Sequence, residues 1–583
     1  MLFNDFCNYL QQIEGISSRN EITIVLSNLF KKLEKSELPA AIYLLQGRVS
    51  PPYIDLEFNF STKLLIRSLA DTEVDLHKIL EEYSILGDIG LLLERHAYSK
   101  GGELRVEEVY DYLLSIANVS GKDSQFKKSK LSQEIISKMN PVEAKFYARI
   151  ILGKLRLGVS DKTIFEGLSW AVNGDKSLKP QLEKAYGARA DLPSIAESLL
   201  YNGPEALLSF RLQVGTPVSS KLVEREKSSE KIFERLGKGM IVQPKYDGLR
   251  MQIHFSENGF DDEFGTALEE TGEKVRLFSR NMSNITSMFP DVVEAVQSLK
   301  VKNIILDSEA IGIDPLTGRF MPFQDTIQRK RKYGVTNKVL EIPVKVFCFD
   351  ILYLNDESLL DIPLRDRLKM MSEEVSPPRS EIILETESAN ISSLEELKMK
   401  FGEYKSAGLE GLIAKSPLGI YEPGTRNYEW IKQKVKAQDT MADSIDAVVL
   451  GYYRGEGVRT KYGIGGILVG LYDPLNDTYQ SLAKVGTGFK DEDLILIKKN
   501  IDELAIPTLP VNVRIDKTLI PDILCRPELV VVVEADQVSK SKLHGSGDFR
   551  FSLRFPRFKY LRFDKKANQA TTVQEAKKLN ELN

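Results

Sequence analysis

Residues 245–250 read Lys-Tyr-Asp-Gly-Leu-Arg, and residues 430–434 read Trp-Ile-Lys-Gln-Lys. A lysine amine with its ordinary pKa of about 10.4 is protonated at neutral pH and cannot attack a phosphorus centre. Cations packed beside an amine disfavour its charged form and make it a better nucleophile. Lys415, Lys432 and Lys434 are the expected neighbours, and they would also hold a triphosphate. A K-x-D-G pattern is short and also occurs in solvated turns, so it needs companions elsewhere in the chain.

Length and composition set the outer limits. The chain has 583 residues, 42% of them hydrophobic and 28% charged, which is typical of a globular protein with about three or four domains. A net charge of -4 neither favours nor excludes nucleic acid, because binding depends on a local basic face. The three cysteines and four histidines have no zinc-ligand spacing, and they predict reduced thiols in a cytoplasmic protein. No secretory signal or membrane-spanning stretch is expected.

The first part of the chain is predicted to be an all-α domain over residues 1–212. Phe3, Phe6 and Leu10 recur at helical spacing, and Asn20 is expected to cap the following helix. The basic run 127–130 is more typical of a solvated face than of a phosphate contact.

After residue 215 the sequence pattern changes to short apolar runs bounded by turns, which predicts an α+β domain over residues 213–438. The expected strands are 241–242, 251–255, 275–278, 304–306 and 344–349. The acidic stretch between Ser256 and Lys274 is expected to be a hairpin tip. From residue 439 to 583, short strands separated by glycine turns predict a small all-β barrel of the OB type.

Polar residues recur where the central strands end. Glu309, Phe349, Glu410 and Lys415 supply carboxylates, an aromatic face and a cation, which together suit a nucleotide. Magnesium is the expected metal, because it prefers oxygen ligands and usually retains substrate phosphates among them. The sequence contains no G-x-x-x-x-G-K-[ST] run, so a P-loop is not expected.

The segment 540–566 is basic. Nine lysines and arginines against two aspartates give it a charge of +7, and six aromatic residues are interleaved with them. Strand alternation would place the aromatic residues inward and the cations outward, toward a nucleic acid or a triphosphate. A basic edge strand without a ligand is the alternative.

These motifs together resemble those of ATP-dependent DNA ligases of the archaeal and eukaryotic replicative type, over nearly the whole chain. They occur in the family's order: KYDGLR at 245–250, SRN at 279–281, LDSEAIG at 306–312, FDILYLN at 349–355, EGLIAK at 410–415, WIKQK at 430–434 and RFPRFKYLRFDK at 554–565. Residues 153–168 also resemble part of the DNA-binding domain of such ligases. The resemblance implies a DNA-binding domain at 1–212, an ATP-grasp-like adenylation (nucleotidyltransferase) domain at 213–438, and an OB-fold domain with a C-terminal tail at 439–583.

The resemblance also implies residue roles. Lys245 would be adenylated, Glu309 would bind the ribose, Phe349 would stack on adenine, and Glu309 and Glu410 would bind magnesium, with manganese as an alternative. Phosphate and ribose contacts would come from Arg250, Arg280, Lys415, Arg426, Lys432, Lys434, Arg562 and Lys565, with Asp564 beside the last two. The expected reaction seals nicks in double-stranded DNA during replication, repair and recombination. The protein is expected to be a monomer associated with the nucleoid. The OB-type barrel is expected to close over ATP about a hinge at 436–441.

Two departures from the family pattern stand out. Gln243 occupies the position where the family usually has a glutamate that accepts a hydrogen bond from the adenine amino group. Its amide oxygen can accept the same bond without the charge, which predicts looser base selectivity. Residues 99–103 contain no clear sliding-clamp box, so binding of a clamp stays open.

Two other functions fit part of the pattern. An mRNA guanylyltransferase also uses K-x-D-G and a terminal R-x-D-K, but the helical domain and the RFPRF run favour a DNA ligase. A nucleic-acid-binding protein with an inactive nucleotide site is disfavoured by the intact Lys245, Glu309, Glu410 and Lys432.

Overall fold

The computed structural model divides the chain into two compact units. It describes residues 1–583 except 70–75, 98, 100, 261–272, 331–334, 376–379, 436–443, 536, 546–548 and 582–583. The first unit contains residues 1–68 and 97–435, and the second contains residues 69–96 and 436–583. The predicted hairpin tip after Ser256 and the predicted hinge at 436–441 fall mainly or wholly outside the described residues.

The N-terminal part of the first unit is helical, as the sequence predicted. Its helices are α1 (Phe3–Glu14), α2 (Arg19–Lys32), α3 (Leu38–Leu45), α4 (Thr62–Leu69), α7 (Val106–Asn118), α8 (Ser124–Ile136), α9 (Pro141–Ile151), α10 (Asp161–Asn173), α11 (Lys179–Ala188) and α12 (Leu192–Asn202). Ser18 caps α2 by accepting from the Glu21 amide, so the prediction of Asn20 as the cap is wrong by two residues. In the basic run on α8, Lys128 is buried and donates to the Phe58 carbonyl at 2.6 Å. This lysine is structural.

Two sheets follow in the same unit. The first has the order β1-β11-β10-β2-β9, and the second has the order β4-β3-β5-β6-β7 with β8 beside β6. The strands of the first sheet are β1 (Leu222–Arg225), β2 (Met240–Lys245), β9 (Ala389–Ile391), β10 (Gly411–Lys415) and β11 (Arg426–Lys434). Those of the second are β3 (Leu249–Ser256), β4 (Val275–Ser279), β5 (Asn303–Gly312), β6 (Val344–Leu354), β7 (Glu357–Ser358) and β8 (Ile383–Glu385).

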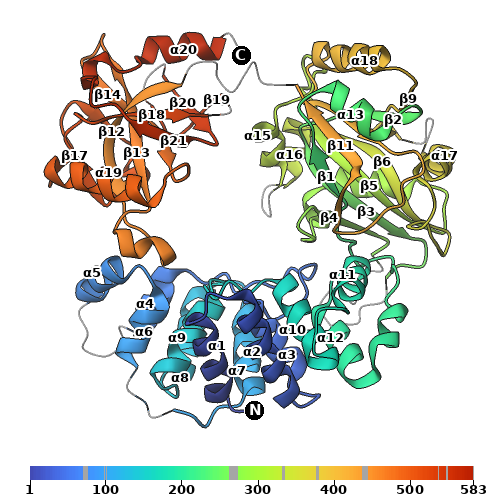
Figure 1. Ribbon diagram of the computed structural model, residues 1–583, viewed down its shortest axis with the longest axis horizontal. Helices are drawn as coiled ribbons and strands as arrows, with labels where there is room; N and C mark the ends of the chain where they lie inside the picture. The colour runs from blue at the N-terminus through green and yellow to red at the C-terminus, as the bar shows by residue number, and fades with distance from the viewer. Residues whose placement is uncertain are drawn as a thin grey trace. The chain divides into compact units, whose positions relative to one another are not determined.

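Helices cover the outer faces of these sheets. Helices α13 (Ser229–Leu236) and α18 (Leu394–Ser406) lie on one face of the first sheet (Figure 1), where Ile232 and Leu397 pack against Val242 and Leu412. The second sheet has its own core with α14 (Pro290–Gln297) and α17 (Leu364–Val375). Short helices α15 (Phe323–Thr326) and α16 (Val335–Glu341) lie between β5 and β6 in the chain. The inner face of the first sheet is thereby left for other contacts.

The second unit consists mainly of strands. These are β12 (Ile445–Tyr453), β13 (Gly466–Asp473), β14 (Thr478–Val485), β15 (Ala505–Ile506), β16 (Val513–Arg514), β17 (Ile523–Cys525), β18 (Val530–Glu534), β19 (Gln537–Lys540), β20 (Phe551–Arg554) and β21 (Arg557–Leu561). It also contains α5 (Leu76–Leu86), α6 (Ile89–His96), α19 (Asp491–Glu503) and α20 (Val573–Glu581). The prediction of an all-β C-terminal domain is therefore too simple, because α19 and α20 pack against its core.

The basic C-terminal segment differs in part from its predicted alternation. Phe549, Phe551 and Phe558 are buried as expected, but Phe555, Tyr560 and Phe563 are 62%, 52% and 67% exposed. A bulge in the pairing of β18 with β21 shifts the register before Tyr560, and the other two residues lie outside strands. Half of the aromatic side chains therefore lie among the cations.

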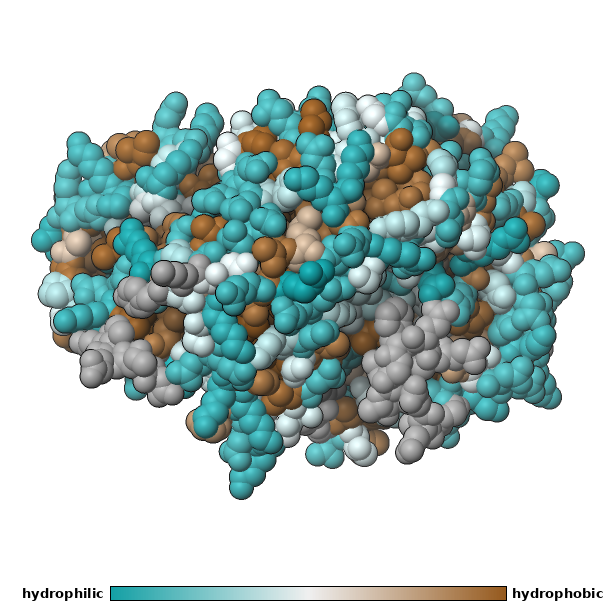
Figure 2. Space-filling view, turned by 90° about the horizontal axis from the view of Figure 1, so that it is seen from below, coloured by the Kyte–Doolittle hydropathy of each residue, from teal (hydrophilic) through white to brown (hydrophobic). Residues whose placement is uncertain are grey.

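The protein's thiols are all inside. Cys7, Cys348 and Cys525 are buried and free, and burial raises the pKa of each thiol, that of Cys525 to about 12. Hydrophilic and hydrophobic residues are interspersed on the face seen in Figure 2, as is usual for a protein surface. Among the helices that the structure describes, none is long and apolar enough to span a bilayer.

Candidate functional site

Strand alternation gathers five of the predicted side chains on the inner face of the first sheet. Val242, Leu412 and Ile431 point toward α13 and α18, so their neighbours along each strand point the other way. The register then aligns the three strands, because Lys245 pairs with Gly411, and Gly411 with Lys434. The side chains on this inner face are Gln243, Lys245, Lys415, Lys432 and Lys434.

Lys245 is held by a carboxylate that it shares with another lysine. Glu410 forms ion pairs with both Lys245 and Lys434 through its two carboxylate oxygens. Burial alone would raise the pKa of Glu410, but the two lysine charges outweigh burial and lower it. Burial, together with Lys245 and Lys434, also lowers the pKa of Lys432. Lys432 and Lys434 thus lie beside the predicted nucleophile, whereas Lys415 pairs with Ile241 toward the other end of β2.

Glu309 approaches from the second sheet. It is paired with Arg250 in the β3–β5 register, and its Oε1 accepts from the Gly248 amide at 3.2 Å. A Cβ atom at Gly248 would lie 2.4 Å from the Ala310 carbonyl oxygen, so the glycine of K-x-D-G permits close packing on β5. Burial raises the pKa of Glu309 to about 7, and the charges of Lys245 and Arg250 offset this only in part.

Arg250 is tied to a partner that the sequence did not reveal. Its Nε and Nη2 donate to the two Asp307 oxygens at 3.0 and 2.6 Å, and Tyr421 Oη donates to Asp307 at 2.7 Å. Asp307 is fully buried, and Asp307 also raises the pKa of Arg250 against the effect of burial. Arg250 therefore has a structural role in this site in addition to any contact with a ligand.

Lys415 is buried against aromatic rings. Its Nζ donates to the Phe349 carbonyl at 3.2 Å and lies 3.9 Å from the centre of the Trp430 ring and 4.8 Å from that of Phe349. Burial lowers the pKa of Lys415 to about 7, although Asp350 and Asp307 oppose this shift. The sequence named Trp430 only as part of a motif, and cross-strand pairing with Lys415 explains its position.

Gln243 has its amide fixed beside the same phenylalanine. Its Nε2 donates to the Phe349 carbonyl at 3.4 Å and to Ser388 Oγ at 3.0 Å. The side chain is buried, and Ser388 was not singled out from the sequence.

The remaining predicted residues are Arg280 and Arg426 in the first unit, where the Arg426 charge also helps to lower the pKa of Lys432, and Arg562 and Lys565. Arg280 is exposed after β4, and no hydrogen bond or ion pair of its side chain is seen among the described residues. Arg426 is exposed at the start of β11. Arg562 and Lys565 belong to the second unit, where both pair with Asp446 and Arg562 also binds Asp564 at 2.8 Å.

The carboxylates fit a magnesium ion that keeps most of its ligands from water and substrate. Glu410 is ion-paired with Lys245, and the Lys245 charge also acts on Glu309 of the second sheet. No cluster of three or more protein ligands occurs among the described residues. That arrangement agrees with the preference of magnesium for one or two carboxylates plus phosphates.

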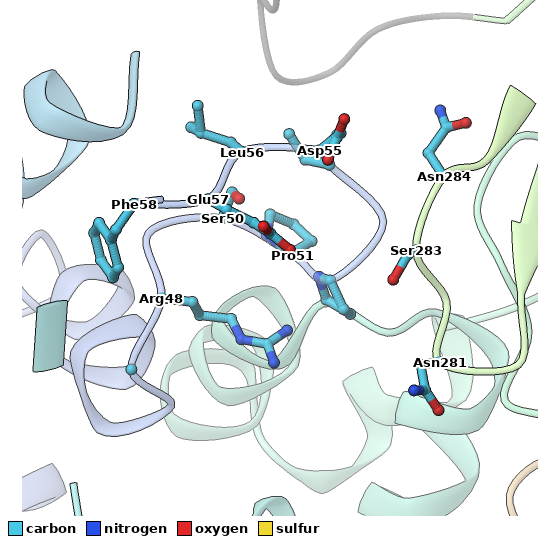
Figure 3. A pocket seen from close by; sticks show the side chains of 13 residues that line it. Arg48, Ser50, Pro51, Asp55, Leu56, Glu57, Phe58, Asn281, Ser283 and Asn284 are labelled. Atoms are coloured by element: carbon cyan, nitrogen blue, oxygen red, sulfur yellow. The ribbon is translucent and has the colours of Figure 1, made fainter. Parts of the chain in front are cut away.

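A separate cavity of about 350 Å³ lies between residues 47–58 and residues 281–284 (Figure 3). Figure 3 shows the Arg48 side chain beneath the 50–57 loop and the Ser283 hydroxyl on the opposite side. Asp55 and Glu57 also line the cavity, so its lining carries more negative than positive charge. This balance does not favour a phosphate.

Three family models match successive parts of the chain. They are described as "DNA ligase N terminus" (residues 2–169), "ATP dependent DNA ligase domain" (residues 220–434) and "ATP dependent DNA ligase C terminal region" (residues 460–565). The order agrees with the helical part, the two sheets and the β-rich unit of the structure.

Relatives of similar length match almost the entire chain. A probable DNA ligase of Dictyoglomus turgidum is 39% identical, with 99% of this chain and 97% of the relative covered. A DNA ligase of Sulfolobus acidocaldarius is 34% identical, with the same two coverages. A solved structure titled "Pmar-Lig_PreS3" matches with a TM-score of 0.56 at 16% identity, covering 96% of this chain and 99% of that one, which supports the fold alone.

Proposed function

The chain belongs to the family of ATP-dependent DNA ligases, and from this premise we propose that it seals nicks in duplex DNA through an adenylated Lys245. One observation carries the proposal. Lys245 lies on the same sheet face as three other lysines and is ion-paired with Glu410, while Glu309 approaches from the second sheet. Such a site suits phosphoryl chemistry, which depends mainly on positioning and charge neutralisation.

In the first step the Lys245 amine attacks the α-phosphorus of ATP. A nitrogen–phosphorus bond forms, the bond to the bridging oxygen of the β-phosphate breaks, and pyrophosphate leaves. The attacking amine gives up its proton as the bond forms, and Lys432 and Lys434 would place positive charge beside the triphosphate. Lys415 would contact the α-phosphate, and Arg562 and Lys565 would orient the β- and γ-phosphates.

In the second step a 5′-phosphate oxygen of the nick attacks the same phosphorus, which frees Lys245 and forms a 5′-adenylated strand. In the third step the 3′-hydroxyl attacks the 5′-phosphate, so that a phosphodiester forms and AMP leaves. Arg280, exposed just after β4, and Arg426, exposed at the first residue of β11, are proposed to contact phosphates. Bound magnesium would neutralise phosphate charge, held by Glu309 and Glu410.

Adenine would stack on Phe349, and the Arg250 guanidinium and the Lys415 amine lie 5.3 and 4.8 Å from the centre of its ring. The Gln243 amide, next to the same residue, would meet the edge of the base. We further propose that the reaction serves replication, repair and recombination, on the basis of family membership.

The test is covalent labelling. Full-length protein is incubated with α-labelled ATP and magnesium and then with nicked duplex DNA, beside the variants Lys245→Ala and Lys238→Ala. Lys238 is an exposed lysine shortly before β2 and serves as the control. Label should attach to the wild type and Lys238→Ala, should be discharged as the nick closes, and should not attach to Lys245→Ala. Label that attaches without sealing DNA would reject nicked DNA as the acceptor.

A further inference from the structure

The hydrogen bonds around Gln243 determine which way its amide points. A carbonyl oxygen only accepts, so the contact of 3.4 Å between Gln243 and the Phe349 carbonyl requires the amide nitrogen on that side. Ser388 Oγ donates its proton to the Thr386 carbonyl at 3.4 Å, so Oγ is left to accept from Gln243 Nε2 at 3.0 Å. Both hydrogens of the amide nitrogen are therefore used within the protein.

The amide oxygen is left over. Within the part of the chain that the structure describes, no group donates a hydrogen bond to Gln243 Oε1. A flipped amide would bring Oε1 against the Phe349 carbonyl oxygen and would require Ser388 to give up its bond to Thr386. The observed orientation thus presents an acceptor, and hides the donor, two residues from Lys245 on the same strand face.

We propose that Ser388 is a positioning residue that fixes Gln243 Oε1 as an acceptor and thereby selects a 6-amino purine nucleotide over a 6-oxo purine nucleotide. This inference rests on the proposed function, because it requires that the base of the nucleotide reaches Gln243. The 6-amino group of ATP can donate to Oε1. The 6-oxo group of GTP would face it with lone pairs, and a polar pair left unmatched in a buried site is costly.

An amide at this position must be held in one orientation if it is to select one purine. A glutamate has two accepting oxygens, so its rotation changes nothing that the base would meet. A glutamine amide has one accepting oxygen and one donating nitrogen, so an amide that is free to flip can hydrogen-bond to either purine. Ser388, just before β9, holds the Gln243 amide in this orientation. The selectivity of Gln243 therefore depends on a residue 145 positions away in the sequence.

The experiment compares covalent labelling of the full-length protein by α-labelled ATP and α-labelled GTP in single turnovers. The variants are Ser388→Ala, Gln243→Glu, the two combined, and Ser392→Ala as an exposed control serine on the same segment. Ser388→Ala should lower the ATP-to-GTP rate ratio about three- to tenfold, the value of one partly exposed hydrogen bond. The combined variant should recover the ratio, because a carboxylate has no donor to present.

A purely structural role for Ser388 predicts a different result. It would slow labelling by both nucleotides equally, would lower the melting temperature, and would not be rescued by Gln243→Glu. An unchanged ratio in Ser388→Ala, or an absent rescue, would overturn the inference while leaving ATP labelling of the wild type intact. If the wild type takes label from neither nucleotide, the proposed function itself fails.

Discussion

Replacing Lys415 with methionine should stabilise the part of the chain that contains the two sheets while it abolishes adenylation. Lys415 is fully buried, and its amine binds only the Phe349 carbonyl and the aromatic rings, with no described carboxylate in hydrogen-bond contact. Methionine keeps most of the volume and removes the charge. The variant would lose the cation next to the proposed α-phosphate position.

The magnitude follows from the pKa of Lys415, which burial lowers to about 7. Between that value and its unfolded value of about 10.4, the unfolded chain binds the proton and the folded chain does not, so stability rises with pH. The lysine then costs the folded state about 4 kcal/mol at pH 7 and about 2 kcal/mol at pH 9. The lost hydrogen bond and ring contact offset about 2 kcal/mol, which leaves a net gain of about 2 kcal/mol at pH 7 and almost none at pH 9.

Urea unfolding followed by tryptophan fluorescence measures this gain, because Trp430 is one of only two tryptophans and lies against Lys415. Lys405→Met, at an exposed lysine on α18, controls for other groups that titrate over the same range. Retention of labelled AMP is measured on the same samples. A Lys415→Met variant that is less stable than the wild type at pH 7, or whose gain does not shrink at pH 9, would refute the reasoning.

Three further outcomes are expected. Asp307→Asn should destabilise the protein by about 3–5 kcal/mol in urea unfolding, because it leaves the buried Arg250 charge without its partner. Replacing both residues with apolar ones should lower the free energy of unfolding by less, and an equal loss would argue against a buried ion pair. Burial moves the pKa values of Glu309 and Lys415 both to about 7, so adenylation should pass through a maximum near pH 7, as the Glu309 carboxylate forms and the Lys415 cation is lost, and Glu309→Gln should remove the rising limb of the rate profile. Burial lowers the pKa of His254 to about 3, and its Nδ1 accepts from the Gly215 amide, so the folded chain resists protonation and stability should fall as the pH drops from about 6.5 toward 3. His254→Gln should reduce this fall in stability in acid unfolding curves, and an unchanged slope would show that other groups cause it.

Local pattern predicted only part of the elements that carry the site. The sequence placed Lys245 and Lys415 in one α+β region but predicted a strand only at residues 241–242, whereas β2 runs to Lys245 and Lys415 ends β10. Helical spacing likewise predicted α1. The cap of α2 was misplaced because serine and asparagine are both good caps, and two residues separate them.

Contacts between residues on distant strands could not be predicted from the sequence. Arg250 meets Asp307 and Tyr421 only after β3, β5 and the segment before β11 are brought together, and no spacing along the chain encodes that meeting. The same holds for Ser388 and Gln243. The exposed aromatic residues near the C-terminus escaped prediction because a bulge shifts the register before Tyr560 and because Phe555 and Phe563 lie outside strands.

The burial of every native thiol makes the protein a clean background for site-directed spectroscopy. Cys7, Cys348 and Cys525 are inaccessible and poorly ionised, so maleimide dyes would react slowly with them. One new cysteine at Met399, which is 62% exposed in the first unit, and one at Leu475, which is 83% exposed in the second, would accept a donor and an acceptor fluorophore without removing any native residue of the interior. Energy transfer between the two dyes would then follow the separation of the units, molecule by molecule, through a complete cycle of adenylation and sealing.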